Sequence, residues 1–180
     1  MNLEESGRQK GAKKNNPSSR SRSFILQELK YITENPSESY SVGLQDSSNI
    51  YVWEVVFMCP KDTLYEGALL KGLMTFPTTY PEDPPSFRFT SEVWHPNIDQ
   101  KGNVCISILH NPGEDIYEYE DVTERWMPVR DINSVLLSIT ILLNYPNPDS
   151  PANLEAAQEY MNDAASYKKR VRRLVEKTLL

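Results

Sequence analysis

The spacing of apolar residues changes along the chain and marks out its elements. Apolar residues at helical spacing predict a helix over residues 24–34, with Ser23 as its N-cap and Asn35-Pro36 as its stop. Four β-type segments follow, separated by turn-rich stretches: Tyr40–Leu44, Ile50–Met58, Leu69–Phe76 and Phe87–Phe89. Because no helical stretch interrupts them, they predict a four-stranded antiparallel meander.

A helical period returns in the last third of the chain. Asp131 is the predicted N-cap of a first helix, Asn153 is the predicted N-cap of a second over Leu154–Asn162, and a third runs from about Ala165 to Leu179. Three prolines predict an extended, rigid loop from Tyr80 to Pro85. One helix, four strands, a loop that bears a cysteine and three more helices together predict an α+β domain.

The distribution of charge separates a tail from the rest of the chain. The net charge is −6, but residues 1–22 carry six Lys/Arg against two Glu, a surplus of +4, so the remainder carries −10. We predict a disordered basic extension over residues 1–22 and one core domain over residues 23–180. An acidic core repels phosphate backbones, so nucleic acid is not an expected partner. The longest apolar run, residues 135–143, is too short for membrane insertion.

Candidate chemistry centres on one of the two cysteines. Cys105 lies eight residues after the tripeptide His95-Pro96-Asn97. A thiolate is a good nucleophile and, once acylated, a good leaving group, so Cys105 suits acyl relay. The Asn97 amide is of the right type to stabilise an oxyanion, and loss of one such donor typically slows a reaction by about 100- to 1000-fold. His95 is interpreted either as a base or as a structural imidazole that supports the loop, while His110 is expected to be a loop residue.

Several motifs in a fixed order resemble the ubiquitin-conjugating enzymes, the E2 class. They are Tyr80-Pro81 with Pro84-Pro85, His95-Pro96-Asn97-Ile98, Cys105, Trp126-x-Pro128 and Tyr145-Pro146-Asn147-Pro148. The resemblance runs from about Ser23 to Leu180 and implies the ubiquitin-conjugating (UBC) fold. It implies that Cys105 accepts the ubiquitin C-terminus as a thioester and that Asn97 supports the oxyanion or the active-site loop. It implies no bound metal or cofactor, since ATP is consumed by the upstream activating enzyme.

A long acidic segment follows the cysteine. Six of the sixteen residues between Leu109 and Trp126 are acidic and one is basic. With Ser150-Pro151-Ala152-Asn153, this segment resembles the Ubc7/G-type subfamily, which implies assembly of degradative ubiquitin chains. Many family members carry Asp where Ser150 stands, near the thioester, where it helps the incoming lysine lose its proton. Serine is a poor base for this step. The acidic-loop residues that we consider as the base in its place are Glu118, Glu120 and Asp121.

The resemblance also places a ligase-binding surface and the partners. Glu82-Asp83 stands where the family usually has an apolar residue that docks on the ligase, and Met127-Pro128 supplies a second contact. The implied partners are ubiquitin, the activating enzyme (E1), a RING-type ligase (E3) and protein lysines. We expect a monomer in the cytoplasm, since two cysteines far apart suit a reducing compartment, with recruitment to the endoplasmic reticulum surface or the nucleus as further locations.

Four alternatives compete with this interpretation. In the first, the cargo is a related modifier instead of ubiquitin. In the second, the protein is a cysteine hydrolase that pairs His95 with Cys105, and in the third it is a noncatalytic ubiquitin-binding module. The fourth is a zinc site from Cys59, Cys105, His95 and His110, which lacks any usual ligand spacing. Retention of Cys105 and Asn97 argues against the noncatalytic module, and the short His95–Cys105 spacing argues against the hydrolase.

Overall fold

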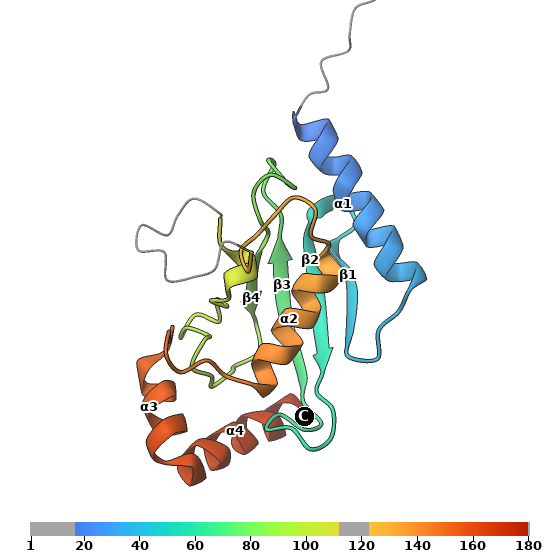
Figure 1. The fold of residues 1–180 in the computed structure, drawn as a ribbon. Helices are drawn as coiled ribbons and strands as arrows, with labels where there is room; N and C mark the ends of the chain where they lie inside the picture. Colours follow the sequence, from blue (N-terminus) through green and yellow to red (C-terminus); the bar gives the residue numbers. More distant parts are fainter. Residues whose placement is uncertain (1–16, 112–122, 180) are drawn as a thin grey trace, which may run out of the picture.

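The computed structural model describes residues 17–111 and 123–179 (Figure 1). The elements, in chain order, are α1 Pro17–Glu34, β1 Tyr40–Asp46, β2 Asn49–Met58, β3 Leu69–Thr75, β4 Ser86–Phe89, the 3₁₀ helix η1 Ser107–Leu109, α2 Ile132–Asn144, α3 Leu154–Asn162 and α4 Ala164–Thr178. The strands pair antiparallel in the order β1-β2-β3-β4, which confirms the predicted meander. The predicted α+β class is therefore confirmed.

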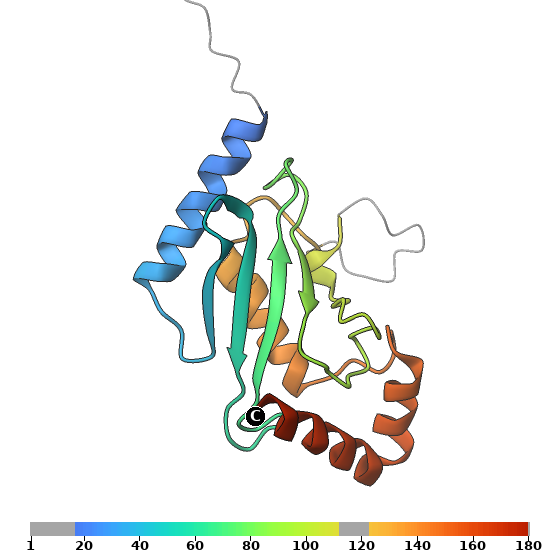
Figure 2. The ribbon, with the colours of Figure 1, turned by 180° about the vertical axis from the view of Figure 1, so that it is seen from behind.

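One face of the sheet is covered by α2, while α1 flanks its β1 side and α3 and α4 lie at one end (Figures 1 and 2). The helix α2 is apolar on the side that packs on the sheet, where Val135, Leu136 and Ile139 are fully buried. Burying one such aliphatic side chain contributes about 1.5–3 kcal/mol, so this helix is a main source of core stability. No helix among the described residues is long and apolar enough to cross a bilayer.

Two predicted N-caps are confirmed. Asp131 Oδ1 accepts a hydrogen bond from the Ser134 amide at 2.7 Å, and Asn153 Oδ1 accepts one from the Ala156 amide at 3.1 Å. Each bond satisfies one of the amides that have no partner within the first turn of a helix. These caps set where α2 and α3 begin, and α2 leads away from the Trp126 turn.

The start of α1 differs from the prediction. The helix begins at Pro17, so residues 17–22 are not part of a disordered extension and Ser23 lies within the helix rather than capping it. The reason is tertiary: Ser21 is fully buried and its hydroxyl donates to Tyr51 Oη at 3.1 Å. Residues 1–16, the rest of the predicted extension, lie outside the described part of the chain.

The start of the proline-rich loop differs from the extended segment that we predicted over Tyr80–Pro85. Two turns lead into it, with the Tyr80 amide donating to Pro77 O and the Glu82 amide donating to Thr79 O, whereas Pro84 and Pro85 lie outside these turns. These turns let the Tyr80 ring enter the core, where it packs edge-on against Phe76. Burial of this aromatic ring outweighs the extended preference of the prolines.

Candidate functional site

His95 is a structural residue of the loop that precedes Cys105. Its side chain is fully buried; Nε2 lies 2.9 Å from Leu142 O, and Nδ1 accepts a hydrogen bond from the Asn97 amide at 3.0 Å. Since a carbonyl only accepts and an amide only donates, the ring is the neutral tautomer with the proton on Nε2. Burial lowers the pKa of His95 to about 4, so the ring is neutral at physiological pH. This arrangement supports the predicted structural role and leaves no nitrogen for a hydrolase that pairs His95 with Cys105.

Asn97 joins two loops that are fifty residues apart in sequence. Its Nδ2 donates to Asn147 O at 2.7 Å and to Ser150 O at 3.2 Å, and its Oδ1 accepts from the Asn147 amide at 2.8 Å. The side chain is only 2% exposed. All of its strong hydrogen-bonding capacity is therefore used within the protein, which favours loop support over a freely available oxyanion donor.

The backbone beside Asn97 strengthens the same junction. Pro96 O accepts hydrogen bonds from the amides of Ala152 and Asn153, at 2.8 and 2.9 Å. The loop over residues 147–153 is thus held along its length against the His-Pro-Asn tripeptide. Within it, the Ser150 carbonyl is bound to Asn97, while the residue as a whole is exposed at the surface.

Cys105 is positioned by a tight turn and by Asn97. Asp99 closes the turn by accepting bonds from the amides of Lys101 and Asn103, each at 2.8 Å. Gly102 has a φ of +89°, and a Cβ there would lie 2.2 Å from Phe89 O, so only glycine fits. The Cys105 amide then donates to Asn97 O at 2.9 Å. The half-buried thiol is therefore held at the surface beside the Asn97 junction.

The structure brings a histidine to the thiol that the sequence interpretation had treated as a plain loop residue. His110 Nε2 lies 3.6 Å from Cys105 Sγ. The helix η1 causes this approach, because its single tight turn reverses the chain between the two residues. A helical turn directly after the cysteine was the signal that sequence reasoning missed.

The three acidic-loop candidates, Glu118, Glu120 and Asp121, lie outside the described residues. Glu124, the last acidic residue of the segment, is described and is exposed. The identity of the base that acts on the acceptor lysine therefore stays a prediction.

The two segments expected to bind a ligase lie side by side. Trp126 is fully buried, and its Nε1 donates to Pro81 O at 2.8 Å, joining the Glu82-Asp83 turn to the Met127-Pro128 turn. Of these four residues Glu82 and Pro128 are exposed, and Asp83 and Met127 are half-buried. The next residue, Val129, is 87% exposed and is an apolar surface residue that the sequence interpretation missed.

Glu82 is not an isolated charge on this surface. Arg20 of α1 approaches it with Nη1 2.8 Å from Glu82 Oε1. Arg20 lies in the part of the chain that we had expected to be disordered. The start of α1 therefore belongs to the same surface and compensates one of its two acidic side chains.

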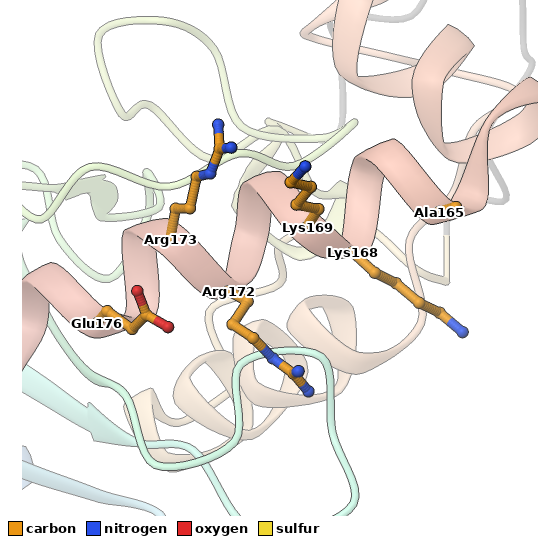
Figure 3. Close-up of a pocket in the computed structure, with 6 residues that line it drawn as sticks. All are labelled: Ala165, Lys168, Lys169, Arg172, Arg173 and Glu176. Atoms are coloured by element: carbon orange, nitrogen blue, oxygen red, sulfur yellow. The ribbon is translucent and has the colours of Figure 1, made fainter.

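Other chemical groups of the described chain lie apart from this site. Burial raises the pKa of Cys59 to about 11, so this thiol is a poor nucleophile at neutral pH. No three His, Cys, Asp or Glu side chains within residues 17–111 and 123–179 gather closely enough to hold a metal ion. A hollow on α4 is lined by Lys168, Lys169, Arg172 and Arg173 together with Ala165 and Glu176 (Figure 3). Its cations are exposed, as on a solvated helix face.

The fold and the cysteine loop define the class of protein. A four-stranded meander backed by α2, with a surface thiol next to a buried His-Pro-Asn junction, is the arrangement of a ubiquitin-conjugating enzyme. The family model described as "Ubiquitin-conjugating enzyme" matches residues 24–175. The chain belongs to this family, and is thus an E2 transferase.

Relatives cover most of the chain. The Schizosaccharomyces pombe protein named "Ubiquitin-conjugating enzyme E2 15" is 48% identical over 163 residues, which cover 91% of this chain and 98% of the relative. The Arabidopsis thaliana protein named "Ubiquitin-conjugating enzyme E2 7" is 48% identical over 157 residues, 87% of this chain and 95% of the relative. An African swine fever virus protein named "Ubiquitin-conjugating enzyme E2" is 45% identical over 161 residues, 87% of this chain and 72% of the relative. These similarities support the resemblance to the Ubc7-type enzymes.

Proposed function

We propose that this protein accepts the C-terminus of ubiquitin as a thioester on Cys105 and transfers it to a lysine amine with the help of a ligase. The observation that carries the proposal is the half-buried thiol of Cys105, anchored through its own amide to Asn97 beside the loop at Ser150. In charging, Sγ attacks the carbonyl carbon of the thioester on the activating enzyme, and the sulfur of that enzyme leaves. In discharge, a lysine nitrogen attacks the new thioester and Cys105 Sγ leaves.

Asn97 supports discharge mainly by shaping the site. Its amide holds the loop at residues 147–150 against the His-Pro-Asn tripeptide, and we propose that this loop borders the path of the acceptor lysine. The longer of its two donated bonds, 3.2 Å to Ser150 O, is the one that an oxyanion would replace. His95 acts one step further back, because its Nδ1 holds the Asn97 amide.

We test the proposal by mixing the protein with activating enzyme, ubiquitin and ATP and resolving the products with and without a reducing agent. An adduct that a thiol removes is expected for the natural chain and for Cys59→Ala. Cys105→Ala should form none. Absence of any adduct from the natural chain, with normal thermal unfolding, would overturn the assignment. Replacing ubiquitin by related modifiers in parallel lanes tests the alternative cargo.

The type of product and the ligase surface are finer parts of the proposal. We propose degradative polyubiquitin chains on the likeness to the Ubc7-type enzymes, with a carboxylate among Glu118, Glu120 and Asp121 aiding the acceptor lysine. Removing residues 111–124 should then change chain building more than charging.

We propose that a RING ligase binds Glu82, Asp83, Met127 and Pro128. Joint substitution of the two turns should reduce ligase-stimulated discharge and leave unassisted charging intact.

We also propose a monomer that binds no cofactor, with ATP used by the activating enzyme alone. The expected location is the cytoplasm, with recruitment to the endoplasmic reticulum surface or the nucleus. The solution mass from light scattering and the distribution of the tagged protein among cell fractions test these points.

A further inference from the structure

The feature that goes beyond the proposed function is a cationic surface on α4, which takes no part in ubiquitin transfer as proposed above. The hollow in Figure 3 is lined by four exposed cations, one carboxylate and one small residue: Lys168, Lys169, Arg172, Arg173, Glu176 and Ala165. We call the four cations the α4 cationic face. Figures 1 and 2 show α4 at the opposite end of the sheet from the loop that joins β3 to β4, which bears the Glu82-Asp83 turn.

The cations of this face are uncompensated, unlike other cations of the same helix. The Arg170 guanidinium lies 3.3 Å from the centre of the Trp94 ring, and Lys177 Nζ forms an ion pair with Glu92 at 2.9 Å. Within the described part of the chain, none of the four members of the α4 cationic face forms an ion pair with a carboxylate. The fold therefore supplies partners for two cations of α4 and leaves a cluster of four without them.

The stability of the helix does not explain this cluster. Lys168 and Arg172, like Lys169 and Arg173, are like charges four residues apart, and such pairs destabilise a helix. The favourable interaction of a cation with the helix dipole is confined to the last turn, where Lys177 is the basic residue. The cluster also runs against the composition of the chain beyond residue 22, which carries a net charge of −10. Exposure alone is typical of a solvated face, but four uncompensated like charges in an acidic protein indicate a binding surface.

The two rows of the α4 cationic face match the repeat of an extended polypeptide. Lys169 and Arg173 point to one side of α4, and Lys168 and Arg172 point to the other (Figure 3). The two members of each row are four residues apart, so they begin about 6 Å apart along the helix. Side chains on one side of an extended chain repeat at about 6.6 Å. A run of four acidic residues therefore presents two carboxylates to each row, and the small side chain of Ala165 leaves one end of the hollow open.

The chemistry of the lining favours protein carboxylates over a membrane or a nucleic acid. Guanidinium groups bind a carboxylate through two parallel hydrogen bonds, and lysines add mobile point charges. A helix that binds a bilayer needs large apolar side chains beside its cations, and none of the six lining residues is of that kind. A bilayer or a nucleic acid also carries many negative charges, which the acidic remainder of the chain repels, whereas a short acidic segment carries few.

We propose that the α4 cationic face docks an extended acidic segment of a partner protein, with two carboxylates against each row of cations. Exposed ion pairs are individually weak and are screened by salt, so the affinity depends on the four cations acting together and falls as the ionic strength rises. Because α4 lies far from the Glu82-Asp83 turn, the segment can stay bound while a ligase occupies that turn.

The test is the fluorescence anisotropy of a labelled peptide of about twelve residues with a central run of four glutamates, titrated with the full chain at about 50 mM salt. The control peptide has glutamine in place of each glutamate. We expect saturable binding of the acidic peptide and none of the control. Raising the salt to about 200 mM should weaken binding by about tenfold, because the Debye length becomes shorter than the spacing of the two rows from most of the solvent-exposed charge of the peptide.

Paired substitutions locate the site. Lys168→Gln with Arg172→Gln removes one row, and Lys169→Gln with Arg173→Gln removes the other. Each pair should weaken binding by about five- to tenfold, as for the loss of two exposed ion pairs, and all four together should abolish it. Glutamine keeps the helix, since its helix propensity is close to that of lysine and arginine.

Matched variants test whether position or total charge matters. Lys30→Gln with Arg88→Gln removes two exposed cations from α1 and β4 and should leave the affinity within twofold of the natural chain. Glu176→Gln removes the carboxylate that lies among the cations and should strengthen binding by about twofold. Thermal unfolding of each variant checks its fold.

Three results would overturn the inference. One is no saturable binding of the acidic peptide by a natural chain that unfolds normally, and another is equal binding by the natural chain and by both row variants. The third is that the cationic face prefers another occupant: vesicles with about a fifth phosphatidylserine, a single-stranded oligonucleotide of about twelve thymidines, or a second copy of the chain seen as a rise in solution mass. Since peptide binding is measured without activating enzyme or ubiquitin, this inference and the proposed function can fail independently.

Discussion

Replacing Asn97 by alanine separates two roles that this amide has in principle. A pure oxyanion donor contributes to the rate of lysine discharge but not to the stability of the resting protein. A residue that joins two loops contributes to both. Because the Asn97 side chain makes three hydrogen bonds to residues 147–150, we expect Asn97→Ala to lower the free energy of unfolding as well as the rate.

The magnitude follows from those bonds. A hydrogen bond contributes about 1 kcal/mol net, and the Asn147 and Ser150 groups left behind recover some hydration because both residues are exposed. We therefore expect a loss of about 2–3 kcal/mol. For a domain of this size that corresponds to a fall in Tm of roughly 5–10 °C. Discharge to free lysine should fall by about 100-fold or more, while charging on Cys105 should be reduced far less.

The assay compares thermal and urea unfolding with single-turnover discharge of the thioester. The matched control is Asn144→Ala, since that amide makes one bond, to Thr140 O at 3.1 Å, within α2. It should cost at most about 1 kcal/mol and leave discharge unchanged. A Tm for Asn97→Ala within one degree of the natural chain, with discharge still lost, would refute the loop-support argument and leave the oxyanion role.

Three further predictions concern stability. The pKa of His95 is about 4 in the folded protein and near 6.5 in the unfolded chain, so the unfolded state binds the extra proton as the pH falls. The free energy of unfolding should therefore be highest above pH 6.5 and should drop by about 1.5 kcal/mol between pH 6.5 and 5. Urea unfolding should show a weaker pH dependence for His95→Gln. Gly102→Ala should lower stability by more than about 2 kcal/mol, because a positive φ and a clash with Phe89 O act together; an unchanged urea midpoint would contradict this. Arg20→Ala should change the free energy of unfolding by less than about 0.5 kcal/mol, because its ion pair with Glu82 is exposed. A larger loss, measured from the fall in Tm, would show that the start of α1 is held by more than this one ion pair.

Local chemistry explains what was predicted correctly. The N-caps at Asp131 and Asn153 depend on a bond three residues away, and the meander follows from runs of β-type residues without intervening helices. The cysteine and its His-Pro-Asn tripeptide are readable in the same way, because their types and spacing are written in the chain.

Long-range contacts decided what the sequence could not. The helix α1 extends to Pro17 because Ser21 is buried beside Tyr51, thirty residues away, and such burial leaves no local sign. The proline-rich segment begins with a turn because the Tyr80 ring packs in the core. In both cases packing outweighed the local preference of the residues.

The family and the order of the elements are predictable from the sequence because residues close together express them, and the same holds for the choice of Cys105 as the candidate nucleophile. The surroundings of that cysteine depend on contacts between distant segments. In the folded chain the Asn97 amide joins loops fifty residues apart, His95 is buried as a neutral support, and the turn at η1 brings His110 to the thiol. Hydrogen-bond partners and burial of this kind form only when segments distant in sequence pack together, so the local sequence does not reveal them.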